Sequence, residues 1–211
     1  MLTVLNLLFQ WALDRGCVEA NPCVSVKRFV QKPRDRLITP KEYAAIYKGC
    51  PPWLQCVMDL CYPTGQRIGD VLKTEDGHLR DEGVYFEQQK TGKRLVVEWT
   101  LELHAAVDRS QDLRVAPSRT PYLLGGRGGN LRLHSNVWRN FKEAATKANI
   151  HDVTLHDLRA MSGTDAESES IDPSALLGHS DPRTTKIYLR DRTRKLVKVH
   201  ASIPLTTKSA M

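Results

Sequence analysis

The sequence has 211 residues, of which 41% are hydrophobic and 26% are charged, so it can form one good-sized core, or one domain and part of another. Lys and Arg exceed Asp and Glu by 31 − 24 = 7, and the isoelectric point is about 9.2. This excess favours a polyanionic partner such as nucleic acid, because basic side chains displace the counterions of phosphate backbones. A basic surface that binds nothing is the alternative.

The five cysteines indicate reduced thiols rather than a disulfide framework or a zinc site, because their number is odd and no C-x-x-C pair is present. The apolar start of the chain is too short to span a bilayer, and no cleavage site for a signal peptide follows it. The sequence therefore predicts a soluble protein.

The first predicted helix covers residues 2–15, where apolar side chains recur along one stripe that is expected to be buried. Gly16 is placed to end this helix, and the charged residues 27–36 follow as a connector. One amphipathic helix ahead of a linker cannot form a domain alone. Residues 1–33 are therefore expected to be the C-terminal remnant of one domain plus a linker, and residues 34–211 a second domain with a C-terminal tail.

The next three predicted helices have clear start signals. In Thr39-Pro40-Lys41-Glu42, a threonine N-cap, a proline at the first position and a glutamate at the third form a capping box. A second helix is expected after Pro51-Pro52, and a third just after Thr64-Gly65-Gln66. Residues 84–99 predict a β-hairpin, because two β-rich runs flank Thr91-Gly92.

The second half of the chain is predicted to be mainly helical. A helix over residues 101–109 precedes a stretch over 114–132 that is mostly loop, with a short strand at 122–124. N-cap signals for four later helices follow at Ser135, Thr154, Asp172-Pro173 and Asp181-Pro182. Helices with one small antiparallel sheet inserted indicate the α+β class.

Several residues of this chain suit a phosphate. His156 and Arg159 stand at positions i and i+3 near the start of a predicted helix, so they share one face where the helix dipole favours an anion. Arg67 could supply a second guanidinium, and two guanidiniums can grip a phosphate by forked hydrogen bonds. Each residue also has an ordinary reading, such as an arginine paired with Asp157.

Two further motifs could complete such a site. His179 and Tyr188 are nine positions apart with a helix start between them, so the imidazole and the phenol can approach one point. Tyrosine can act as a covalent nucleophile, whereas its ordinary role is that of a core aromatic with a hydrogen-bonded hydroxyl. Lys90 lies at the tip of the predicted hairpin, with Lys93 as its competitor.

In chain order, the candidate catalytic residues are Arg67, Lys90, His156, Arg159, His179 and Tyr188. This set resembles the tyrosine recombinases, the phage integrase family. Thr64-Gly65-Gln66-Arg67 is similar to the family's first arginine motif, and Lys90-Thr91-Gly92 to the turn of its catalytic lysine. The family's strongest signature is a Leu-Gly-His turn followed by Thr-Thr and tyrosine. The segment from Leu177 to Tyr188 matches this signature closely.

The resemblance extends from about residue 3 to about residue 200, with two departures. The interval from His156 to His179 is short, because residues 166–171 lack the longer stretch ending in glycine that many members have. The larger departure is the N-terminal part. Members clamp DNA between two domains, and this chain corresponds to the catalytic domain (34–211) with the last helix of the core-binding domain (1–33).

The resemblance implies a site-specific DNA recombinase or integrase, serving a phage or prophage, that works through a 3′-phosphotyrosyl intermediate. Tyr188 would be the nucleophile, Arg67 and Arg159 would hold the phosphate, Lys90 would protonate the leaving oxygen, His156 would be the general base, and His179 would hydrogen-bond the phosphate. No cofactor or metal is expected. The implied partner is double-stranded DNA, with a homotetramer on DNA and a monomer in isolation.

Three points stay open at this stage. A type IB topoisomerase-like enzyme shares the same residue logic, and a non-catalytic DNA-binding regulator derived from an integrase belongs to a different class. The tail over residues 189–211 could pack in cis or in trans.

The location that the resemblance implies is the bacterial cytoplasm, in association with the nucleoid.

Overall fold

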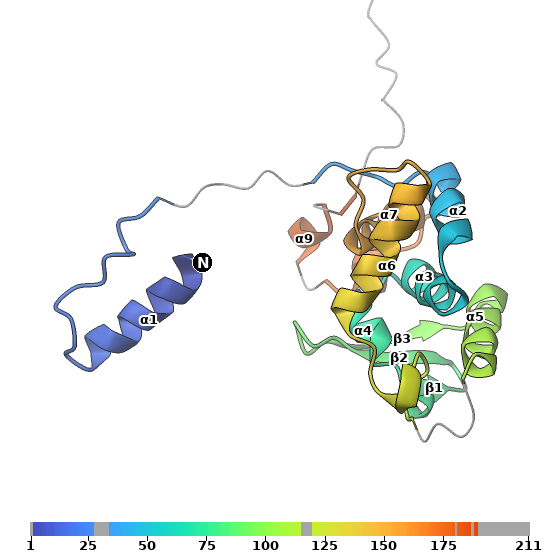
Figure 1. Cartoon of the computed structure of the whole chain (residues 1–211), viewed down its shortest axis with the longest axis horizontal. Coiled ribbons are helices and arrows are strands. Elements are labelled where there is room, and N and C mark those ends of the chain that lie inside the picture. Colours follow the sequence, from blue (N-terminus) through green and yellow to red (C-terminus); the bar gives the residue numbers. More distant parts are fainter. Residues whose placement is uncertain (1, 28–33, 115–119, 180, 187, 190–211) are drawn as a thin grey trace, which may run out of the picture. The chain divides into compact units, whose positions relative to one another are not determined.

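The structure is a computed structural model that describes residues 2–27, 34–114, 120–179, 181–186 and 188–189, apart from the side chains of Arg127 and Pro182. It divides into two compact units, residues 1–34 and 35–211, which are described separately (Figure 1). The described residues contain no helix long and apolar enough to cross a membrane.

The first unit contains helix α1, Leu2–Asp14. The prediction of a helix is confirmed, and Gly16 adopts the left-handed conformation just beyond its end. The expectation that its apolar stripe is buried is wrong, because α1 contains no buried residue and Leu8 and Trp11 are more than half exposed. A single helix in so short a unit has too little surrounding chain to cover its apolar side chains.

The second unit is mainly helical. Its helices are α2 (Pro40–Gly49), α3 (Pro52–Thr64), α4 (Ile68–Leu72), α5 (Leu101–Asp112), α6 (His134–Lys147), α7 (Leu155–Ser168), α8 (Pro173–Leu177) and α9 (Pro182–Lys186). Helix α3 packs against α5 and α7, and α2 packs against α6. One apolar cluster joins these helices, so α3 and α7 run through the core and can hold residues at their ends in fixed positions.

The predicted caps are confirmed at most helix starts. Thr39 and Glu42 form the capping box of α2, and Thr154 and Asp157 form the capping box of α7. Ser135 is the exception, because α6 begins at His134 and its N-cap position is Leu133, two residues before Ser135. Its first turn thus has no side-chain cap, and the helix is held by the buried face that includes Val137 and Phe141.

The small sheet has three antiparallel strands in the order β1-β2-β3: β1 (Leu79–Arg80), β2 (Gly83–Glu87) and β3 (Arg94–Glu98). The predicted hairpin is β2 with β3, and β1 was not predicted, because two residues are too few to show an alternation. Val84 and Phe86 point into the core. The strand expected at residues 122–124 is reduced to one bridge between Glu75 and Tyr122.

The end of α7 accounts for the short interval in the sequence. Ser170 adopts a left-handed conformation with φ 61°, two residues after the helix, and so takes the place that glycine commonly fills. Asp172 then caps α8, and Asp181 accepts a hydrogen bond from the backbone N–H of Arg183 in α9. All five cysteines are free, as expected. The tail over residues 190–211 lies outside the described residues.

Candidate active site

Arg159 is the buried centre of the site. It lies in the second turn of α7 with 2% of its surface exposed. Its Nη1 donates to the carbonyl of Gly65, and its Nη2 donates to the carbonyl of Leu177 and to Nε2 of His179, 2.9 Å away. Its Nε is buried without a hydrogen-bond partner. The guanidinium is therefore held in a fixed orientation, with its Nε left without an acceptor.

Arg67 stands at the N-cap position of α4, directly after the turn at Gly65. Gly65 ends α3 in the left-handed conformation, φ 62°, which glycine adopts without strain. The Nη1 of Arg67 donates to Oε1 of Gln88 at 2.9 Å and lies 3.9 Å from Oδ2 of Asp70. Asp70 Oδ2 has no hydrogen-bond partner of its own. This turn thus brings the second guanidinium to the same region as the first.

His179 lies in the turn after α8 and is held from both sides. Since Arg159 can only donate, Nε2 of His179 must accept, so the proton of the neutral ring is on Nδ1. Nδ1 then donates to Oγ1 of Thr185 at 2.9 Å, and this oxygen lies 2.9 Å from Oγ of Ser174. Thr185 belongs to α9, so this chain of contacts connects the buried arginine to the helix that precedes Tyr188.

Tyr188 is placed among the basic residues. Its ring centroid lies 5.1 Å from that of His156 and 5.0 Å from that of His179, and the Arg159 guanidinium carbon lies 5.4 Å from it. The ring is partly buried. Five of the six predicted residues, Arg67, His156, Arg159, His179 and Tyr188, therefore converge through direct contacts or shared neighbours.

The pKa values of this group show a strongly positive, partly desolvated environment. Burial, and then the nearby charge of Arg67, lower the pKa of Arg159 to about 10. Burial, and then the charge of Arg159, lower the pKa of His179 to about 4. The pKa of His156 is lowered by partial desolvation and then by the charge of Arg159, although the residue is exposed. Both imidazoles are thus neutral at neutral pH and can accept a proton.

Both lysines of the β2–β3 turn lie near the site. Lys90 is exposed at the tip, and its charge contributes to the lowered pKa of His156. Lys93 Nζ donates to the backbone carbonyl of His179 over 3.5 Å, and its charge contributes to the lowered pKa of that residue. Geometry alone thus leaves both lysines as candidates for a proton donor.

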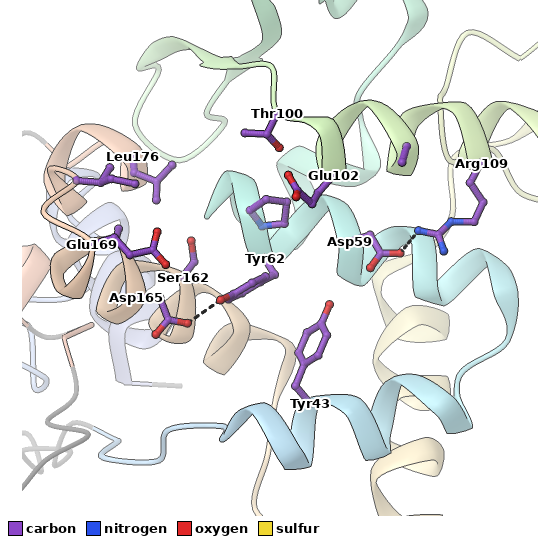
Figure 2. A pocket seen from close by; sticks show the side chains of 14 residues that line it. Tyr43, Asp59, Tyr62, Thr100, Glu102, Arg109, Ser162, Asp165, Glu169 and Leu176 are labelled. Carbon is purple, nitrogen blue, oxygen red and sulfur yellow. Dashed lines mark hydrogen bonds and ion pairs between the residues drawn. The ribbon is translucent and has the colours of Figure 1, made fainter.

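A pocket of about 270 Å³ opens beside the two arginines, with Arg67, His156 and Arg159 among its lining residues. Its wall also includes His134 and Trp138 of α6, which the sequence analysis did not single out. A larger pocket of about 700 Å³ contains none of the six candidate residues, and its mixed lining includes acidic, aromatic and apolar side chains together with Arg109 (Figure 2). In it, Tyr62 donates to Asp165 at 2.7 Å. The basic character of the smaller pocket suits an anion.

Sequence reasoning missed the polar residues that support the site. Gln66 and Gln88 are almost fully buried, and Thr185 is 2% exposed. One signal was available for Gln88, since it continues the inward alternation of Val84 and Phe86 just beyond β2. Thr185 carried no such signal, because its role depends on where α9 lies relative to α8.

The comparisons with known proteins identify the family of the chain. Residues 36–195 match the model of the Phage integrase family, so the chain belongs to that family. All six candidate residues lie inside the matched range. The integrase of Escherichia phage HK022 is 28% identical over 205 residues, which are 91% of this chain and 57% of that protein. Tyrosine recombinase XerD of Ralstonia nicotianae is 29% identical, covering 94% of this chain and 70% of that protein.

Solved structures share the fold. The catalytic core of lambda integrase is 26% identical with a TM-score of 0.61, covering 69% of this chain and 96% of that one. A lambda integrase dimer bound to a COC′ core site matches with a TM-score of 0.76 at 24% identity, covering 95% of this chain and 61% of that one. The predicted α+β class is confirmed. The chain spans a little under three fifths of the length of the phage integrases it matches.

Proposed function

We propose that this chain is the DNA-cleaving part of a site-specific tyrosine recombinase that integrates or excises a phage or prophage. The observation that carries the proposal is the convergence of Tyr188 with two neutral imidazoles and the buried guanidinium of Arg159. The unused Nε donor of Arg159 supports a phosphate at this point, because a phosphate oxygen would supply the missing acceptor.

In the first step, the phenolic oxygen of Tyr188 attacks a DNA phosphorus atom and gives its proton to His156. The new P–O bond is the 3′-phosphotyrosyl link, and the bond from phosphorus to the 5′-oxygen breaks. Lys90 gives a proton to that leaving oxygen. Arg67 and Arg159 hold the non-bridging oxygens and stabilise the charge of the pentacoordinate transition state. The lowered pKa of His156 keeps the ring able to accept a proton at neutral pH.

In the second step, the 5′-hydroxyl of another strand attacks the phosphotyrosyl phosphorus, and the proton transfers run in reverse. One phosphodiester replaces another, so no external energy source is required. His179 hydrogen-bonds the phosphate in this scheme. Because its Nε2 accepts from Arg159 when no DNA is bound, the ring must gain a proton, or move its proton from Nδ1 to Nε2, before that atom can donate. The negative charge of a bound phosphate favours such a gain.

The assembly is also part of the proposal. Residues 1–33 would be the end of a core-binding domain, so that DNA is clamped between it and the catalytic domain of residues 34–211. Lambda integrase has been solved as a tetramer bound to a Holliday junction, and by this likeness we extend a homotetramer on double-stranded DNA to this protein. The location would be the bacterial cytoplasm, at the nucleoid. No cofactor or metal takes part in the scheme.

Covalent trapping tests the proposal. The protein is incubated with nicked attachment-site DNA and run on a denaturing gel beside Tyr188→Phe. Tyr85→Phe is the matched control, since the Tyr85 hydroxyl donates to Glu87 at the surface. An adduct seen in the wild type and control but lost in Tyr188→Phe is expected. No adduct, even from a longer protein with both domains and its own site, would favour the non-catalytic regulator.

A further inference from the structure

Gln88 is a buried amide at the junction of three parts of the site. It follows β2 and has no exposed surface, because the strand's alternation places it on the inward face with Val84 and Phe86. A carboxamide in such a place is costly unless all its polar atoms are hydrogen-bonded. The hydrogen-bond partners of Gln88 therefore indicate its structural role.

Both ends of the Gln88 amide have two partners. Its Oε1 accepts from Nη1 of Arg67 and from Oγ1 of Thr91, each at 2.9 Å. Its Nε2 donates to Oε1 of Gln66 at 2.7 Å and to the carbonyl of Leu177 at 3.0 Å. One side chain thus joins the first arginine, the turn that carries Lys90, and the start of the turn that carries His179.

Gln66 fixes the orientation of the Gln88 amide. Its Nε2 donates to the carbonyls of Thr64 and Leu176, at 3.0 and 2.8 Å, so its Oε1 is left to accept from Gln88. The fit also involves Gly178, since a Cβ there would stand 2.4 Å from Nε2 of Gln88. Neither amide can be turned over without placing acceptors against acceptors.

We infer that Gln88, oriented by Gln66, is a positioning residue of the cleavage reaction. It fixes the positions of Arg67, the Lys90 turn and the His179 turn relative to one another. It touches none of the reacting atoms in the proposed mechanism and acts through Arg67 and the turns. The inference rests on the proposed function for its catalytic consequence. The tether itself is a property of the protein without DNA.

The main test replaces Gln88 by methionine, which has similar length and cannot form the four hydrogen bonds. Gln89→Met is the matched control, because the Gln89 side chain is exposed at the next position. Adduct formation at saturating nicked DNA is expected to slow about 10- to 100-fold in Gln88→Met. Affinity for intact DNA, measured in a Tyr188→Phe background, is expected to change by less than about twofold, and the control should match the wild type in both.

A double variant tests whether the two glutamines act as a unit. Gln66→Met should slow cleavage as Gln88→Met does, and the double variant should be no more than about threefold slower than the worse single variant. Independent contributions would multiply instead. A cleavage rate for Gln88→Met equal to the wild-type rate, or slowing that is fully explained by weaker DNA binding, would overturn the inference.

Hydrogen exchange separates the tether from catalysis. The amides of Thr91 and Gly92 donate to the backbone carbonyl of Gln88, so loosening the turn should speed their exchange in Gln88→Met and not in Gln89→Met. Unchanged exchange in Gln88→Met would overturn the proposed tether, whether or not the protein forms an adduct with DNA. Failure to form any adduct is a separate outcome and would refute the proposed function. If Gln88→Met does not fold, Thr91→Val removes one contact at an exposed position and should give the same effects, smaller in size.

Discussion

Arg159 contributes to both the stability and the chemistry of the site. A lysine there keeps the charge but cannot reach Gly65 O, Leu177 O and His179 together, because it lacks the planar fork. We expect Arg159→Lys to lower the free energy of unfolding by roughly 1–3 kcal/mol, and to slow adduct formation by about 100-fold or more. Denaturant unfolding and single-turnover cleavage measure the two effects. Arg159→Lys with wild-type stability would contradict the described hydrogen bonds.

His179 gives a pH prediction with a definite sign. Its pKa is lowered to about 4 in the folded protein, against about 6.5 in the unfolded chain. It therefore contributes stability that is present above pH 6.5 and is lost as the pH falls toward 4. Over this pH window, His179→Gln should lose less of its unfolding free energy than the wild type does, as measured by denaturant titrations at several pH values. NMR titration should also show a higher pKa for His179 once DNA is bound; an unchanged pKa would argue against its contact with phosphate.

Lys90 and Lys93 can be separated by the chemistry of the leaving group. If Lys90 protonates the 5′-oxygen, Lys90→Ala should slow cleavage by about 100- to 10,000-fold. A substrate with sulfur in place of that oxygen should restore the rate, because a thiolate leaves without being protonated. Lys93→Ala, which loses the contact with the His179 carbonyl, should gain nothing from the sulfur substrate. Rescue of Lys93→Ala alone would reassign the proton donor.

At the scale of elements, the Leu177-Gly178-His179 turn has a strict packing requirement. Gly178 has φ 65°, and a Cβ there would collide with Gln88 and approach Leu95. Gly92 has φ 66° but open space around it, so Gly92→Ala serves as a control for backbone strain alone. Gly92→Ala is expected to cost about 1 kcal/mol, and Gly178→Ala roughly 1–2 kcal/mol more. Equal unfolding free energies for the two variants would show that the turn is not tightly packed.

The elements were largely predictable from the sequence because their signals are local. The capping boxes at Thr39 and Thr154 and the hairpin around Gly92 depend on residues a few positions apart. The cap at Ser135 was wrongly predicted, because tertiary packing determined where α6 begins. Strand β1 was not predicted, because two residues are too few to show an alternation. The polar network of Gln66, Gln88 and Thr185 depends on contacts between distant segments, so no local pattern could have predicted all of it.

At the scale of the whole molecule, the net charge of +7 predicts binding that weakens with salt. With Tyr188→Phe, the logarithm of DNA affinity should fall linearly with the logarithm of salt concentration. Adding Arg67→Ala should reduce the slope by about 1, because one phosphate contact is lost. Arg114→Ala should leave the slope unchanged, since that guanidinium is paired with both carboxylate oxygens of Asp76. Equal slopes for all three proteins would show that Arg67 does not contact a phosphate.

The central claim is that Tyr188, among the six tyrosines of the chain, forms the covalent bond with DNA. Its most direct measurement is mass spectrometry of the adduct, formed in excess EDTA with nicked DNA and digested to peptides. The expected result is a nucleotide linked through its 3′-phosphate to the peptide that contains Tyr188. A nucleotide on any other residue, or linked through a 5′-phosphate, would contradict the account.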